Sequence, residues 1–156
     1  MTTYEGRIDG GGRRIALVAS RFNQIVTDLL ATGAREELRR DGVDPGSIDV
    51  AWVPGSFELP IAAAKLARTG RYAGIVALGA VIRGDTPHFD YVAGEAAGGL
   101  GAVARETGVP IGFGVLTTET LEQALDRAGG KVGNKGAEAA RTVLEMASLL
   151  EGIEKG

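Results

Sequence analysis

The sequence contains no cysteine and only one histidine. The absence of cysteine excludes disulfides, thiol catalysis and thiolate metal sites, and a single imidazole disfavours a metal site built from histidines. The N-terminus has no apolar signal segment, and no apolar run approaches the length of a membrane span. We therefore expect a soluble, cytoplasmic protein with no membrane partner.

Long runs of one charge are also lacking. The net charge is −3 and no basic run occurs, which disfavours a nucleic-acid-binding surface. The 156 residues, of which 44% are hydrophobic, suffice for a single domain over residues 1–156 with a core of its own. The 25 glycines are about twice the usual share. Most fall at the ends of predicted elements, where they favour tight turns and close backbone approaches.

Four short apolar runs without alternation are typical of strands covered on both faces. A helical pattern follows each of them, which predicts a parallel sheet with right-handed connections. We expect a three-layer α/β/α sandwich with a central four-stranded parallel sheet, flavodoxin-like, plus a short N-terminal strand at Tyr4–Ile8. The predicted strands are Ile15–Ala19, Ile48–Val53, Gly74–Ile82 and Ile111–Leu116, and the predicted helices are Gln24–Arg40, Ser56–Arg68, Pro87–Glu106, Thr120–Ala128 and Lys135–Leu150.

The stretch Gly74–Val92 carries the most chemistry. Its strand ends at Arg83-Gly84, and Thr86-Pro87 favours a helix start with Thr86 as N-cap and Pro87 at the first helical position. Free backbone N–H groups and the positive helix end make this turn a potential anion site, with the base His88 next to it. The other interpretation is that the turn only redirects the chain and His88 is an ordinary first-turn residue.

Ligands of parallel sheets bind at the carboxyl ends of the strands. The post-strand loops Ser20–Asn23, Pro54–Glu58, Arg83–His88 and Leu116–Thr118 are therefore expected to meet at one edge. Phe22 can stack on a flat heterocycle or cover a neighbouring subunit. Glu58 can bind a ring or simply favour a helix N-terminus, and spacing alone favours a contact of Arg127 with the carbonyls ending its own helix.

Five segments resemble the family of 6,7-dimethyl-8-ribityllumazine synthases, enzymes of riboflavin biosynthesis. They cover nearly the whole chain in order: VASRFN (Val18–Asn23), VPGSFELP (Val53–Pro60), ALGAVIRGDTPHFDYV (Ala77–Val92), FGVLTTETLEQALDRAG (Phe113–Gly129) and GNKGAEAA (Gly133–Ala140). The resemblance implies condensation of 5-amino-6-(D-ribitylamino)uracil with 3,4-dihydroxy-2-butanone 4-phosphate. Every step of that reaction moves protons and none moves electrons, so no metal or redox cofactor is expected.

The resemblance also implies a role for each matching residue. Phe22 is expected to stack on the pyrimidine ring and Phe113 to close over it from an adjacent subunit, while His88 transfers protons. The uracil and ribityl side is expected to contact Ser56, Phe57, Glu58, Ala80, Val81 and Ile82, largely through backbone groups. Asp85 and Thr86 are expected to hold the phosphate, with Asp85 donating its N–H, and Arg127 to pair with it. Lys135 is a further candidate. Ser56 departs mildly from the alanine that is common in the family.

For assembly, the resemblance implies a homopentamer with shared sites. A hollow icosahedral shell is a further expectation, because the insertion typical of strictly pentameric members is missing at Gly129–Asn134. Tyr4–Ile8 can then join a neighbour's sheet, and riboflavin synthase is a candidate partner. The alternative function is a catalytically silent shell protein of the same fold that binds a flavin or lumazine. Thr86, His88 and Arg127 together favour the enzyme, since a carrier that only stacks a ring needs no phosphate clamp.

Overall fold

The computed structural model describes residues 1–84 and 87–156. A central sheet is formed by β1 (Ile15–Ser20), β2 (Ile48–Val53), β3 (Gly74–Ile82) and β4 (Ile111–Thr118). All four strands are parallel, in the order β2-β1-β3-β4. The predicted four-stranded parallel sheet is thus confirmed, with β1 and β3 in its centre.

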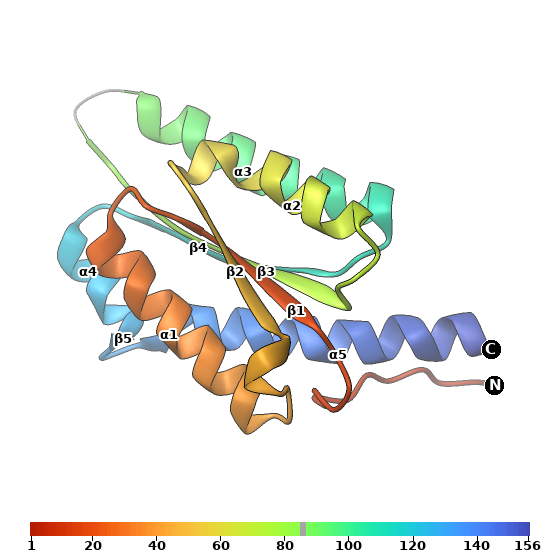
Figure 1. The fold of residues 1–156 in the computed structure, drawn as a ribbon. Helices are drawn as coiled ribbons and strands as arrows, with labels where there is room; N and C mark the ends of the chain where they lie inside the picture. The colour runs from red at the N-terminus through yellow and green to blue at the C-terminus, as the bar shows by residue number, and fades with distance from the viewer. Residues whose placement is uncertain (85–86) are drawn as a thin grey trace.

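Helices cover both faces of the sheet (Figure 1). The helices α1 (Gln24–Arg40) and α5 (Lys135–Lys155) lie on one face together with the short α4 (Leu121–Asp126). The helices α2 (Leu59–Arg68) and α3 (His88–Thr107) cover the other. Each interface holds its own cluster of buried apolar side chains. This arrangement is the predicted three-layer sandwich, and apolar side chains on both faces explain why the strands show no alternation.

Several predicted boundaries differ from the observed ones by one turn or less. A 3₁₀ turn (Ser56–Glu58) precedes α2, and Leu116–Thr118 belongs to β4 rather than to a loop. The helix α3 begins at His88, so Pro87 is its N-cap and not its first helical residue. The predicted N-cap, Thr86, lies outside the described residues. Across the described part of the chain, no helix is both long and apolar enough to cross a membrane.

The expected N-terminal strand is not formed within the single chain. Residues 4–8, all of them described, form no strand; instead, the Arg7 N–H donates to Ser148 Oγ of α5 at 3.2 Å. Between α4 and α5 lies a small antiparallel pair that was not predicted, β5 (Ala128–Gly130) with β6 (Gly133–Asn134). Glycine-rich segments carry little strand propensity, so this pair leaves almost no signal in the sequence.

The glycines of β4 allow α5 to lie close to the sheet. A Cβ on Gly112 would fall 2.4 Å from the Ala139 carbonyl oxygen and 2.7 Å from Val143 Cγ2. Gly114 is equally confined, because its Cβ would meet Leu78 Cδ2 at 2.7 Å. The close approach of α5 to Gly112, and of the Leu78 side chain to Gly114, leaves no room for a larger side chain at either position.

The small residues of α3 have a more limited role than the sequence suggests. Gly99 does allow close packing, because a Cβ there would lie 2.6 Å from Pro60 Cγ of α2. A Cβ on Gly94 or Gly98, in contrast, would meet nothing within 4 Å. Only one of these glycines is thus required by contacts within the chain.

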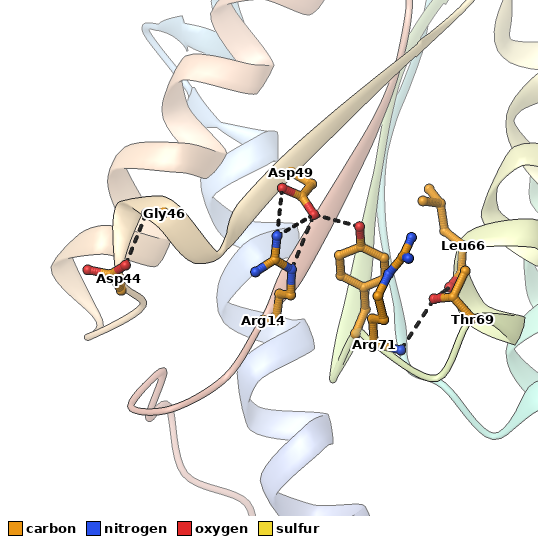
Figure 2. A network of polar contacts seen from close by, with 8 residues as sticks. Arg14, Asp44, Gly46, Asp49, Leu66, Thr69 and Arg71 are labelled. Atoms are coloured by element: carbon orange, nitrogen blue, oxygen red, sulfur yellow. Dashed lines mark hydrogen bonds and ion pairs between the residues drawn. The ribbon is translucent and has the colours of Figure 1, made fainter.

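A polar network joins the strands near their amino ends (Figure 2). The Arg14 guanidinium donates to both carboxylate oxygens of Asp49, at 2.9 to 3.2 Å, and links β1 to β2. The Tyr72 hydroxyl donates to the same carboxylate at 2.6 Å. Hydrogen bonds from Tyr72 and Arg14 lower the pKa of Asp49. The network lies at the amino ends of the strands, at the end of the sheet away from the post-strand loops. It therefore supports the register of the strands and does not form part of a ligand site there.

Candidate functional site

A cleft of about 1220 Å³ opens at the carboxyl ends of the strands. The loops after β1 and β2, the end of β3 and the first turns of α3 enclose it, as expected for a parallel sheet. Its lining combines aromatic side chains with a few polar groups, a composition typical of small-molecule sites. The described lining residues are Phe22, Pro54, Gly55, Ser56, Phe57, Glu58, Ala80, Val81, Ile82, Gly84, His88, Phe89, Asp90, Tyr91, Val92, Gly94 and Glu95.

The loop that carries Phe22 is fixed from two sides. The Phe22 N–H donates to the Pro54 carbonyl at 3.0 Å, which joins this loop to the one after β2. Asn23 has a left-handed backbone conformation (φ 60°), and its Nδ2 donates to the Ala80 carbonyl at 2.9 Å. The ring of Phe22 itself stays 70% exposed. A rigid backbone with an exposed aromatic ring is suited to stacking on a flat ligand.

Asn23 has a structural role that the sequence reasoning missed. Asparagine tolerates the left-handed region better than most residues, and its side chain spans from the start of α1 to the end of β3. From the sequence, an asparagine directly before a helix indicates an N-cap, but in the structure Asn23 makes no side-chain cap and its amide bonds to β3 instead.

The end of β3 extends past its neighbour β1. The ladder between these strands ends at the pair Ala19 and Leu78, whereas the ladder with β4 continues to Ile82. The Arg83 N–H donates to the Thr118 carbonyl of β4, and the Ala80 carbonyl faces the β1 side, where it meets Asn23. Because backbone groups alternate in direction along a strand, the N–H and C=O groups of Ile82 also point toward the β1 side. Beyond Leu78, the β1 side of β3 is thus not covered by the β1 ladder, and Ala80 and Ile82 line the cleft there.

The turn after β2 places backbone groups and one carboxylate at the cleft. The Ser56 side chain is buried against β3, and a Cβ on Gly79 would come within 2.4 Å of its Oγ. The carboxylate of Glu58 folds back over Gly55, since a Cβ there would lie 3.2 Å from Glu58 Oε1. Phe57 stays half exposed. Both interpretations of Glu58, as a ligand contact or as a helix-terminus charge, remain compatible with this position.

His88 is the first residue of α3, is exposed and lines the cleft. Tyr91 and Glu95 also line the cleft, although neither was predicted as a site residue. They follow His88 at spacings of three and seven, which puts all three on one face of a helix. That spacing was a readable signal. Asp85 and Thr86, the expected phosphate ligands, lie outside the described residues.

Three predicted site residues are not among the described residues that line this cleft. Phe113 pairs with Ala77 in the sheet, so it lies back along the strands from their carboxyl ends. Arg127 is the C-cap of α4, on the far face of the sheet from α2 and α3. Lys135 begins α5, and its N–H donates to the Arg127 carbonyl at 2.8 Å. Within one chain, these residues and His88 do not form a single site.

Comparison with known proteins identifies the family. The sequence profile of 6,7-dimethyl-8-ribityllumazine synthase matches residues 12–151. The chain belongs to the 6,7-dimethyl-8-ribityllumazine synthase family. Three lumazine synthases from Nitratidesulfovibrio vulgaris, strains Miyazaki F, DP4 and Hildenborough, are each 53% identical to it over 149 residues. Each alignment covers 96% of this chain and 96% of the relative. The four-stranded parallel sheet with helices on both faces is consistent with the fold of this family.

Proposed function

We propose that this chain condenses 5-amino-6-(D-ribitylamino)uracil with 3,4-dihydroxy-2-butanone 4-phosphate to form 6,7-dimethyl-8-ribityllumazine, phosphate and water. The proposal rests on membership of the lumazine synthase family over residues 12–151. The observation that carries it in the structure is the cleft, which brings an exposed aromatic ring, the carboxyl end of β3 and His88 to one place. The proposed reaction is that of a transferase in the penultimate step of riboflavin biosynthesis, and each of these three features of the cleft is assigned a role in it.

Recognition of the pyrimidine is assigned to the loops around β1, β2 and β3. Phe22 stacks on the ring, and the backbone groups of Ala80 and Ile82 form hydrogen bonds with the amide groups of the ring. Val81 contributes its side chain, since its backbone groups point to β4. The remaining contacts to the uracil and the ribityl chain come from Ser56, Phe57 and Glu58. Holding two substrates in one orientation supplies much of the rate acceleration.

Proton transfer is assigned to His88. The amine of the pyrimidine attacks the ketone to give an imine with loss of one water, and phosphate is then eliminated. The enol formed tautomerises to a ketone, and the second nitrogen of the pyrimidine closes the ring onto this ketone with loss of a second water. Each of these steps needs a proton donor or acceptor, and histidine serves as both near neutral pH. His88 lies at the start of α3, and both it and Gly84 line the cleft. Asp85 and Thr86 are proposed to hold the phosphate, with Asp85 donating its backbone N–H.

The remaining predicted ligands require a second subunit. Phe113, Arg127 and Lys135 lie away from the cleft of their own chain. The expected chemistry, however, needs an aromatic side chain that covers the ring and a cationic side chain that pairs with the phosphate. We propose that a neighbouring copy supplies Phe113 and Arg127 within a homopentamer. Phe113 is 40% exposed on the edge strand β4, which suits a side chain that completes a neighbour's site.

The direct test of the function is to mix both substrates with the purified protein and follow lumazine fluorescence. The expected result is a rate well above the spontaneous background, with release of one phosphate per lumazine. The alternative, a catalytically silent protein that binds a flavin or lumazine, predicts quenching of riboflavin fluorescence on binding but only the background rate.

Replacement of Arg127 tests the phosphate assignment. We expect Arg127→Ala to raise the KM for the butanone phosphate by about 10- to 100-fold, because a charge-assisted phosphate contact is lost, while kcat changes less. The KM for the pyrimidine is expected to stay within about twofold of the wild-type value, since no contact to it is removed. Steady-state kinetics with each substrate varied in turn measure both constants. A change confined to the pyrimidine KM would contradict the assignment.

Assembly is a separate prediction. We expect light scattering after size exclusion to give at least a pentamer, about 80 kDa from the 16.1 kDa subunit, and a much larger shell in near-neutral phosphate buffer. The physical reason is the exposure of Phe22, Tyr91 and Phe113 in a lone chain. A cytoplasmic location and riboflavin synthase as a partner belong to the same proposal. A pentamer alone would refute the shell, and a fully active monomer would refute the shared site.

A further inference from the structure

Arg83 follows the last residue of β3 and makes four contacts with three different elements. Its N–H donates to the Thr118 carbonyl of β4 at 2.9 Å, and its Nε lies 3.1 Å from the carboxylate of Glu119. Its Cζ lies 4.3 Å from the centre of the Phe89 ring, and its Nη2 lies 3.7 Å from Asp90 Oδ1. The side chain thus connects the loop after β4 with the first turn of α3.

The residues that Arg83 contacts in α3 belong to the cleft. Phe89 and Asp90 both line it, directly after His88, whereas Arg83 itself is not among the lining residues. A planar guanidinium can stack on an aromatic ring and pair with carboxylates at the same time, which an ammonium group does less well. The arrangement therefore restrains the backbone that carries His88.

We propose that Arg83 is a positioning residue that holds the first turn of α3, and through it the His88 imidazole, in the geometry needed for proton transfer. This role rests on the proposed function of the cleft. Arg83 acts from outside the cleft, so its loss misplaces a catalytic group and removes no substrate contact. The pairing also neutralises Asp90, whose carboxylate would otherwise repel a phosphorylated substrate at the same helix terminus.

The chain offers a matched control. Arg68 of α2 lies 3.8 Å from Glu106 near the other end of α3, and both side chains are well exposed. Arg68→Met therefore removes an ion pair to the same helix without touching the cleft. Exposed ion pairs contribute little to stability, so neither Arg68→Met nor Arg83→Met is expected to prevent folding.

The experiment compares wild type, Arg83→Met, Arg83→Lys and Arg68→Met. For Arg83→Met we expect kcat to fall about tenfold with both KM values within threefold, because small misplacements of a catalytic group cost about this much. Arg83→Lys keeps the charge and is expected to recover part of the loss. Hydrogen exchange in the peptide covering the start of α3 is expected to accelerate in Arg83→Met but not in Arg68→Met.

Two results would overturn the proposal. Unchanged exchange at the start of α3 in Arg83→Met would show that Arg83 does not restrain this turn, whether or not the wild type forms lumazine. A loss confined to the KM of the butanone phosphate would make Arg83 a phosphate ligand instead. If the wild type forms no lumazine, the proposed function fails, while the exchange measurement still decides the restraint.

Discussion

Replacement of His88 by alanine is expected to lower kcat roughly 100-fold, within a range of about 10- to 1,000-fold. His88 begins α3 at the cleft and is the only histidine in the chain, so no second imidazole can replace it. The loss stays below the largest known for acid–base groups because substrate orientation by the other cleft residues persists. Single-turnover formation of lumazine measures the effect on chemistry rather than on product release.

Two controls make this result specific to proton transfer. His88→Asn keeps a polar side chain at the helix start but cannot exchange protons near neutral pH, so its kcat is expected to match that of His88→Ala. Binding of the pyrimidine substrate, followed by its own absorbance or fluorescence, is expected to stay within about threefold in both variants, since the proposed ring contacts come from other residues. Wild-type turnover in either variant would remove His88 from the mechanism.

Replacement of Gly112 by alanine is expected to destabilise the fold by about 2 to 3 kcal/mol, the upper part of the range for overpacked sites. The added Cβ would lie 2.4 Å from the Ala139 carbonyl oxygen, and a backbone atom within α5 cannot move without shifting the helix. At this chain length the melting temperature is expected to fall by roughly 5 to 10 °C. Thermal unfolding followed by circular dichroism measures the change.

Gly152 of α5 provides the matched control for Gly112. A Cβ at Gly152 would meet nothing within 4 Å, and alanine is the better helix former. Gly152→Ala is therefore expected to leave the melting temperature unchanged or to raise it slightly. A Gly112→Ala protein as stable as wild type would mean that α5 does not lie as close to β4 as the structure places it.

The strands and most helices could be predicted because their physical causes are local. Central strands covered on both faces leave unbroken apolar runs, as in Gly74–Ile82, and the predicted bounds of α1 agree with the observed ones. Capping is equally local: Thr120 accepts from the Gln123 N–H at 3.1 Å, in a capping box formed by residues only three apart in the sequence. The pair β5 and β6 was missed because glycines carry no side-chain pattern.

The site could be predicted only in part, and the reason differs between residues. Phe22 lies in the loop after β1, and His88 begins the helix that follows β3, so the topology alone brings both to the carboxyl end of the sheet. Asn23 and Arg83 act across elements, and the contacts that give them a role exist only after folding. Phe113 and Arg127 lie away from the cleft of their own chain. Their assignment depends on the family resemblance and on a second subunit.

The amino-end network of Arg14, Asp49 and Tyr72 has a consequence for how such a sequence can change over evolutionary time. The network holds β1 and β2 in register at their amino ends, at the opposite end of the sheet from the cleft. A one-residue slip would reverse every side chain of a strand, so register has to be kept while binding loops diverge. Because that restraint lies away from the loops, drift or selection in the loops can alter substrate preference without disturbing the alignment of the sheet.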